Sequence, residues 1–264
     1  MAEFSGMVAI VAGGALGIGR AAARKLATEG ASVVICSDRE DQVEGTVAEL
    51  RDEGLEVSGT RADVTSSDDM KRLVGFAAET YRGVDILVNS AGVQRYGTVL
   101  ETEEEVWDEV LGVNLKGIYL ASRHAIPEMR ERGGGAIVNL SSVQAFASQK
   151  GVAAYTASKG GINALTRAMA LDHAEDNVRV NAVCPASVDT PMLRWSANLF
   201  KGDKSVEETL EDWGKMHPAG RVARPEEVAE VIAFLASPRA SFVTGGDYKV
   251  DGGMLAALGV RLPD

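Results

Sequence analysis

The chain has 264 residues, of which 45% are hydrophobic, and its formal net charge at pH 7 is −11. A chain of this length without a shift in composition predicts a single domain, residues 1–264, built around one large core. Acidic side chains outnumber basic ones by 38 to 27, and the basic ones are scattered along the chain. Nucleic acid and anionic membranes are therefore poor candidates for partners.

The first residues and the apolar runs bear on where the protein works. Residues 5–19 carry no charge but hold five glycines, so they are typical of a strand that leads into a turn and not of a signal peptide. No uncharged apolar run approaches the roughly 20 residues that are needed to cross a bilayer. We therefore expect a soluble, cytoplasmic protein.

Cysteine and histidine are too sparse for a metal centre. Cys36 and Cys184 lie in apolar surroundings and are predicted to be small buried residues in a reducing compartment. His124, His173 and His217 are widely spaced and have no ligand partners at suitable intervals. We predict no metal site.

Strand-like apolar runs alternate with helical patterns in chain order. The predicted strands are 7–12, 32–37, 56–62, 85–89, 136–142, 178–184 and 248–251. Helical spacing of apolar residues marks 19–30, 41–54, 67–82, 103–132 and 151–169, and another helix is expected to begin at Pro225. This alternation predicts an α/β fold, a doubly wound, mostly parallel seven-stranded sheet with helices on both faces. Ligands should bind beyond the carboxyl ends of the strands.

A glycine-rich turn follows the first predicted strand. Gly13 can make the tight turn, Gly17 lets the backbone approach a pyrophosphate, and Gly19 lets the next helix pack closely on the sheet. The backbone N–H groups around Ile18 would then face the phosphates at the start of a helix. The segment predicts a Rossmann-like dinucleotide site.

The end of the second strand bears on which dinucleotide binds. Asp38 can accept hydrogen bonds from both ribose hydroxyls of NAD and would repel the 2′-phosphate of NADP, although it could also simply cap the next helix. The neighbouring Arg39 could instead hold that phosphate. Because Asp38 is expected to be the closer group, we predict NAD and keep NADP as the alternative.

Tyr155 and Lys159 lie four residues apart in a predicted helix, so they share one helical face. An ammonium next to a phenol favours the phenolate and lowers the pKa of the tyrosine. A pair with this spacing can also be an ordinary exposed helix face. Its context favours a role in proton transfer, because Ser142 lies at the end of an apolar run and a glycine loop lies at the start of the chain.

Taken together, these motifs resemble the short-chain dehydrogenase/reductase family over almost the full length of the chain. The matching pieces, in order, are Gly13-x-x-x-Gly17-x-Gly19, Asp63-Val64, Asn89-Ser-Ala-Gly92, Asn114, Ser142, Tyr155-x-x-x-Lys159 and Pro185-x-x-Val188-x-Thr190. Each piece alone is weak, but their joint order is specific.

The resemblance implies roles for four residues. Tyr155 would be the general acid/base, and Lys159 would lower its pKa and bind the nicotinamide ribose. Ser142 would fix the substrate oxygen, and Asn114 would hold a water that links Lys159 to solvent. Hydride would pass directly between the nicotinamide and the substrate carbon, while the protein supplies position and electrostatics.

The resemblance also implies a set of further cofactor contacts. Asp63 and Val64 would contact the adenine, and a wall beside the adenosine ribose would come from the segment after the fourth strand. That wall would consist of Asn89, Ala91 and Gly92. The nicotinamide carboxamide would be held by the last matching segment, through Pro185, Val188 and Thr190.

Three residues depart from the family pattern. Ala12 replaces the usual threonine and removes a hydroxyl that braces the glycine loop. Ser90 replaces an asparagine, so a hydrogen bond between loops is expected to be either shorter or missing, and Ala186 replaces a glycine next to the nicotinamide. None of the three is one of the four residues to which the resemblance assigns catalytic roles.

Substrate choice is expected to lie in the least patterned stretch, 192–218, which is either a lid or a surface helical excursion. Candidate substrate contacts are Gln94, Gln144, Met192 and His217. They suit a small hydroxylated molecule, and we predict NAD-dependent oxidation of a sugar, polyol or related secondary alcohol. The alternatives are an NADPH-dependent 3-oxoacyl thioester reductase and, more remotely, a nicotinamide-binding sensor without turnover. The family resemblance also implies a homotetramer.

Overall fold

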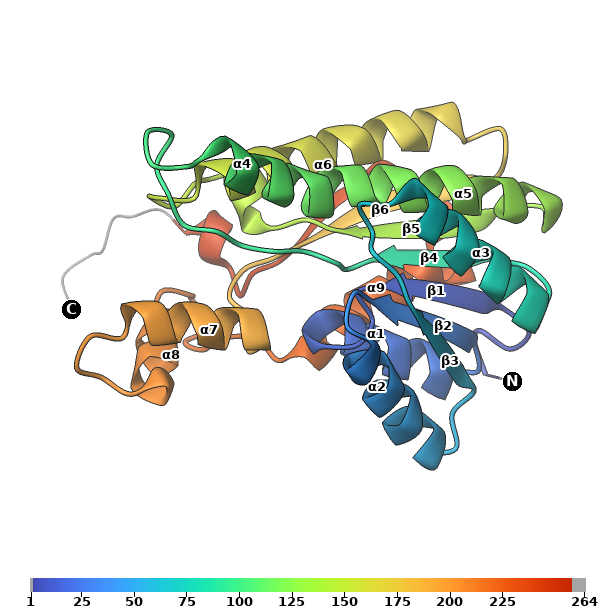
Figure 1. Cartoon of the computed structure of the whole chain (residues 1–264), viewed down its shortest axis with the longest axis horizontal. Helices are drawn as coiled ribbons and strands as arrows, with labels where there is room; N and C mark the ends of the chain where they lie inside the picture. The colour runs from blue at the N-terminus through green and yellow to red at the C-terminus, as the bar shows by residue number, and fades with distance from the viewer. Residues whose placement is uncertain (1, 258–264) are drawn as a thin grey trace.

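A computed structural model describes residues 2–257 of the chain. Its centre is one seven-stranded sheet in the order β3-β2-β1-β4-β5-β6-β7 (Figure 1). The strands are β1 Val8–Ala12, β2 Ser32–Ser37, β3 Val57–Arg61, β4 Ile86–Asn89, β5 Gly135–Leu140, β6 Val178–Pro185 and β7 Asp247–Val250. The predicted doubly wound α/β fold is confirmed, and all six strand pairings are parallel.

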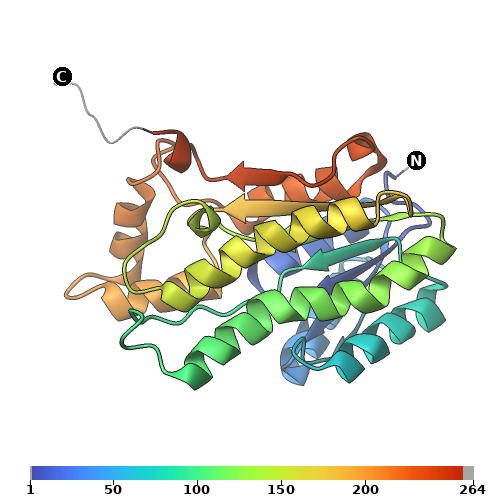
Figure 2. The same ribbon diagram turned by 90° about the horizontal axis from the view of Figure 1, so that it is seen from above.

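Helices cover both faces of the sheet. In Figure 1, α3, α4, α5 and α6 lie above it and α1, α2 and α9 below it, and Figure 2 shows α5 and α6 running side by side across the upper face. The helices of these two layers are α1 Gly17–Thr28, α2 Glu40–Asp52, α3 Ser67–Tyr81, α4 Glu104–Leu111, α5 Gly117–Glu131, α6 Ala153–Asp172 and α9 Pro225–Ala236. Within the described residues, no helix is both long enough and apolar enough to cross a membrane.

The core has two layers because successive residues of a strand face opposite sides of the sheet. Along β1, Val8 and Ile10 face the layer beneath α3, α5 and α6, whereas Ala9 and Val11 face the layer formed with α1 and α9. Cys36 and Cys184 are fully buried, as predicted. Burial raises the pKa of the Cys36 thiol to about 12.

The stretch 103–132, predicted as one helical region, contains an interruption. A five-residue π-helix, Gly112–Lys116, joins α4 to α5. A π-turn holds one more residue than an α-turn, and such turns are frequent at functional sites. Asn114, at the middle of this insertion, is completely buried.

The stretch 192–218 consists mainly of two helices. They are α7 Pro191–Phe200, capped by the Thr190 side chain, and α8 Val206–Gly214, which begins with a capping box between Ser205 and Glu208. These helices pack chiefly on each other and project from the carboxyl end of the sheet (Figure 1). The stretch is therefore a helical excursion in form, and lid closure stays a prediction.

Candidate active site

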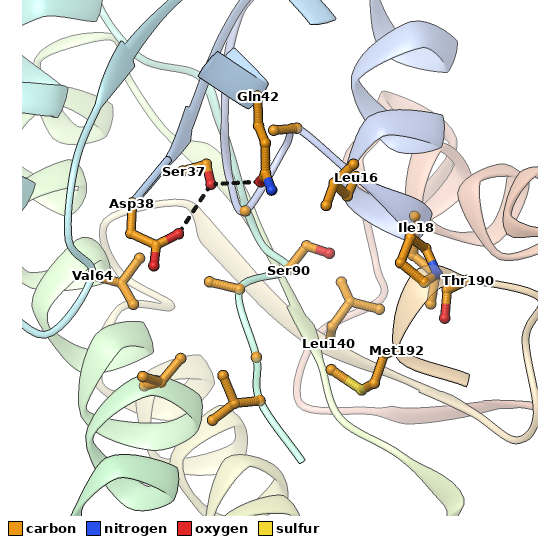
Figure 3. Close-up of a pocket in the computed structure, with 18 of the residues that line it drawn as sticks. Leu16, Ile18, Ser37, Asp38, Gln42, Val64, Ser90, Leu140, Thr190 and Met192 are labelled. Carbon is orange, nitrogen blue, oxygen red and sulfur yellow. Dashed lines mark hydrogen bonds between the residues drawn. The ribbon is translucent and has the colours of Figure 1, made fainter. Parts of the chain in front are cut away.

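A cavity of about 460 Å³ opens at the carboxyl ends of the central strands. That volume lies within the usual range for a small-molecule site. Figure 3 shows Asp38 at one side of the cavity, with Thr190 and Met192 at the opposite side. The predicted site residues that line it are Gly13, Gly17, Ile18, Asp38, Asp63, Val64, Ala91, Gly92, Tyr155, Lys159, Thr190 and Met192.

The glycine loop forms one edge of the cavity. Gly13 has a φ of +78°, and a Cβ on it would lie 2.5 Å from the Ala91 nitrogen, so only glycine fits here. A Cβ on Gly19 would collide with the carbonyl oxygen of Gly13, which explains how α1 starts so close to the sheet. No side chain caps α1 at Leu16, and its first turn holds no acidic residue. Its first N–H groups are therefore open to an anion.

Asp38 and Arg39, which follow β2, are placed differently. Asp38 lines the cavity and accepts a hydrogen bond of 3.2 Å from the Ser37 hydroxyl (Figure 3). Arg39 lies outside the lining and binds Asp41 through two hydrogen bonds of 3.1 Å each. In this structure the guanidinium is paired outside the cavity, whereas the NADP alternative would need it beside the adenosine ribose.

Ser142, Tyr155 and Lys159 meet between β5 and α6. Ser142 follows β5 and accepts a 3.1 Å hydrogen bond from the backbone N–H of Gln144, which fixes the turn. The Lys159 Nζ lies 5.2 Å from the centre of the Tyr155 ring and donates a 2.8 Å bond to the carbonyl oxygen of Leu140. The predicted shared helical face is thus present.

The electrostatics of the pair differ from the prediction. Burial raises the pKa of Tyr155 to about 12, although its hydrogen bond with the Ser142 hydroxyl acts to lower that pKa. Burial also lowers the pKa of Lys159 to about 8. The expected drop in the tyrosine pKa is absent from the protein alone, because removing the phenol from water disfavours the phenolate more than the hydrogen bond with Ser142 favours it.

Asn114 ties the π-helix to the loop after β4. Its Oδ1 accepts a 2.8 Å hydrogen bond from the N–H of Val93, and its Nδ2 donates to the Val93 carbonyl at 3.0 Å and to the Ser158 hydroxyl at 3.1 Å. Both amide hydrogens of Asn114 are therefore used within the protein. The side chain positions the backbone next to the cavity, and the predicted water relay stays a prediction.

Other predicted residues lie away from the cavity lining. Asn89 is buried in the sheet, where its amide donates to Asn139, which in turn donates to Thr166. Val188 is buried beside the cavity, where it pairs with Ala223. The residues that line the cavity also do not include Asn114, Ser142, Pro185, Gln94 or Gln144. The side-chain oxygen of Gln144 instead accepts a hydrogen bond from the Thr156 hydroxyl.

His217 is not a substrate contact in this structure. Its side chain is buried, and its Nε2 accepts a 3.3 Å hydrogen bond from the N–H of Ser187. Its Nδ1 lies 3.0 Å from the carbonyl oxygen of Trp213 at the end of α8. With both nitrogens bound to backbone, His217 joins α8 to the chain after β6, so its assignment to substrate is corrected.

Several lining residues were missed from the sequence. Gln42, in the first turn of α2, accepts a 3.3 Å hydrogen bond from Ser37, and Leu16 projects beside the glycine loop (Figure 3). Leu140 and Ser141 lie at the end of β5, where the rule that ligands sit beyond strand ends could have found them. In the described part of the chain, no three His, Cys, Asp or Glu side chains form a group that could hold a metal ion.

Comparison with known proteins identifies the family. A family model described as Enoyl-(Acyl carrier protein) reductase matches residues 13–255. Human Dehydrogenase/reductase SDR family member 4 is 38% identical over 252 residues, which span 95% of this chain and 88% of that protein. The chain belongs to the short-chain dehydrogenase/reductase family. It is therefore an NAD(P)-dependent oxidoreductase that acts on CH–OH groups.

Two solved structures resemble this short-chain dehydrogenase/reductase closely. The ligand-free aldohexose dehydrogenase of Thermoplasma acidophilum is 37% identical, with a TM-score of 0.92 and coverage of 100% of this chain and 99% of that one. A single-substitution variant of actinorhodin polyketide ketoreductase with NADPH is also 37% identical, with a TM-score of 0.90 and coverage of 94% of this chain and 97% of that one. The family prediction is thus confirmed, whereas the choice between NAD and NADP is not decided by these neighbours.

Proposed function

We propose that this enzyme uses NAD to transfer a hydride between the nicotinamide and a secondary alcohol or ketone, and that the substrate is a sugar, polyol or similar hydroxylated small molecule. One observation carries the choice of NAD. The Asp38 carboxylate faces the cavity at the end of β2, while Arg39 is paired with Asp41 outside the lining. A carboxylate at this place accepts ribose hydroxyls and repels a 2′-phosphate.

The residues present fit a dinucleotide along the cavity. The open N–H groups at the start of α1 would hold the pyrophosphate, and Asp38 the adenosine ribose. Tyr155 and Lys159 line the cavity together with Thr190 and Met192, where the nicotinamide half would lie. When bound, the nicotinamide supplies or accepts the hydride.

The chain's own groups would handle the proton and the substrate oxygen. Tyr155, with a pKa of about 12, is protonated at neutral pH and is suited to give its proton to a carbonyl oxygen during reduction. Ser142 would hold that oxygen. In oxidation Tyr155 must take the proton, and the Lys159 ammonium, 5.2 Å from the ring centre, is placed to stabilise the phenolate.

The substrate class rests on polar side chains that follow β4 and β5, outside the lining of the cavity. Gln94 and Gln144 are half-buried amides on the segments that follow β4 and β5, and amides can bind hydroxyl groups. The structural neighbour named an aldohexose dehydrogenase supports a sugar. For the present chain this assignment is a proposal.

An NADPH-dependent reductase of 3-oxoacyl thioesters is the second candidate. It is favoured by the description of the matching family model and by the neighbour that is a ketoreductase with NADPH. The sensor without turnover has less support, because Ser142, Tyr155 and Lys159 are all present and close together.

The deciding experiment compares specificity constants for aldohexoses, polyols and a 3-oxoacyl thioester, each with NAD(H) and NADP(H). We expect NAD with a hydroxylated substrate to give the largest kcat/KM. A larger kcat/KM for the thioester with NADPH would establish the second candidate. Cofactor binding without turnover on any substrate would favour the sensor.

We also propose that the enzyme is a homotetramer. The outer faces of α4, α5 and α6 expose Trp107, Tyr119 and Leu171, large apolar side chains that a second copy could cover. Light scattering of the purified protein tests this proposal, and a monomer at micromolar concentration would exclude it.

A further inference from the structure

Tyr96 is held beside Tyr155 by a short backbone pairing. The N–H of Gly97 donates a 2.7 Å hydrogen bond to the carbonyl oxygen of Gly151, and the N–H of Ala153 donates a 3.3 Å bond back to the Gly97 oxygen. The segment after β4 is thus fastened to the start of α6, two residues before Tyr155. The Tyr96 side chain packs on the small apolar cluster that contains Tyr155.

Tyr96 also touches the helix pair that projects from the sheet. Its ring stacks on that of Trp195, with centres 5.9 Å apart and planes inclined at 27°. The Phe200 ring meets it edge-on, with centres 4.6 Å apart and an inclination of 80°. Both geometries are favourable for aromatic pairs. The aromatic cluster of Tyr96, Trp195 and Phe200 therefore links α7 to the surroundings of Tyr155.

The cluster is only half covered by protein. Trp195 is 43% exposed and Phe200 54% exposed. Aromatic rings that are fixed in place but open to water lose unfavourable hydration when an apolar face covers them. The first turn of α7 lines the cavity with Tyr155 through Pro191 and Met192, and Trp195 and Phe200 follow on the same helix, just outside the lining.

We propose that the aromatic cluster is the substrate-binding wall of this enzyme and that it binds a six-membered ring carrying a secondary hydroxyl. This proposal rests on the proposed oxidoreductase function and narrows its substrate class. A ring presents a flat face of C–H groups that can lie against Tyr96 and Trp195, whereas a flexible open chain must lose conformational entropy to do so. A carbocycle and a pyranose both have such a flat face, so the experiment includes one substrate of each kind.

The test compares cyclohexanol and an aldohexose with 2-hexanol as the open-chain control, using wild type and the variants Trp195→Ala and Trp195→Phe. For Trp195→Ala we expect kcat/KM for at least one ring substrate to fall about 10- to 100-fold, mainly through KM, and for 2-hexanol to fall less than about threefold. Trp195→Phe keeps an aromatic face and should recover most of the loss. Asn198→Ala, on an exposed position of the same helix, should behave as wild type.

A binding measurement separates this proposal from the proposed function. Tryptophan fluorescence of the NAD-loaded protein is titrated with each ring alcohol, and Trp195→Phe identifies the signal of that residue among the three tryptophans. A ring alcohol that quenches Trp195 but is not turned over would refute the function and support the wall. Equal losses for ring and open-chain alcohols in Trp195→Ala, with no Trp195 signal on binding, would overturn the wall and leave the function standing.

Discussion

The two halves of the candidate site are built in different ways. The cofactor half rests on buried strands and on helices that pack against the sheet, and Gly13, Gly19 and Asn114 fix its loops by close backbone contacts. The α7–α8 pair packs chiefly on itself, and the aromatic cluster and His217, which bonds to Trp213 of α8 and to Ser187 after β6, link it to the rest of the site. A segment with few anchors opens at lower cost than the core.

This difference indicates a division of labour. Hydride and proton transfer need fixed distances between the reacting atoms, so the catalytic and cofactor-binding residues lie on rigid elements. Residues that select the substrate can lie on the more weakly anchored α7–α8 pair. The following predictions ask whether changes in the two halves act on different measurable quantities.

The largest effect is expected at Tyr155. Tyr155→Phe removes the proton donor, and kcat should fall about 100- to 10,000-fold, the usual contribution of a general acid or base. Cofactor affinity and the melting temperature should change little, as measured by fluorescence titration and calorimetry. Tyr119→Phe, on the outer face of α5, is the matched control. If Tyr155→Phe kept wild-type turnover, the chemistry would have to be assigned to another group.

Asn114→Ala tests how rigid the cofactor half is. The variant leaves the half-buried N–H and carbonyl of Val93 without these partners and opens a cavity at the completely buried Asn114, which should lower the free energy of unfolding by about 2–4 kcal/mol. Urea denaturation measures this loss, and cofactor affinity should fall with it. A stability equal to wild type would show that the loop after β4 does not depend on this side chain.

Asp38→Asn acts on cofactor choice within the same half. Loss of the charge should lower kcat/KM with NAD about tenfold, because hydrogen bonds to charged groups are the stronger ones, and should improve the use of NADP. Initial rates with both cofactors measure the ratio. Arg39→Ala should leave that ratio nearly unchanged, and a collapse of NADP use in Arg39→Ala would show that Arg39 leaves Asp41 to bind the phosphate.

Lys159→Met separates function from stability in the cofactor half. Burial lowers the pKa of Lys159 from 10.5 to about 8, so the unfolded chain binds more protons than the folded one between these values. The stability of the wild type should therefore gain from Lys159 as the pH rises from about 8 to 10, and Lys159→Met should lose this gain. At pH 7 the variant should be more stable by about 1–2 kcal/mol but nearly inactive. Denaturation at several pH values tests it, and parallel curves would contradict it.

The smallest effect is expected in the α7–α8 pair. His217→Ala removes the imidazole that bonds to the Trp213 carbonyl of α8 and to the N–H of Ser187 after β6, so this pair should open more readily, by about 1 kcal/mol. Hydrogen exchange should speed up in 191–214 and not in β1 or β4, while KM rises severalfold with kcat nearly constant. Equal acceleration in the strands would show that the two halves unfold together.

The same contrast explains what the sequence could predict. Val- and Ile-rich runs between charged helical segments specify the seven strands, and fixed spacings brought Gly13, Asp38, Tyr155 and Lys159 to one cavity. The π-helix escaped prediction because one added residue hardly changes the apolar period. His217 was misassigned because the spacing of side chains does not reveal that its two nitrogens face backbone groups, one of them the N–H of the distant Ser187.

The rise in the Tyr155 pKa could not be predicted from spacing either. Four residues of separation place the ammonium correctly, but the sign of the shift depends on how much water the fold removes from the phenol. Burial is a property of the tertiary structure, and here it raises the pKa of Tyr155.

The wide turn at Gly112–Lys116 holds one extra residue without rotating the helix that follows it. Kept in regular α-helical geometry, the same extra residue would turn the downstream part by about 100° around its axis. Ala121 and Ala125, now packed on the sheet, would then point sideways. The gain or loss of a single codon at this turn is therefore compatible with an unchanged packing face in α5.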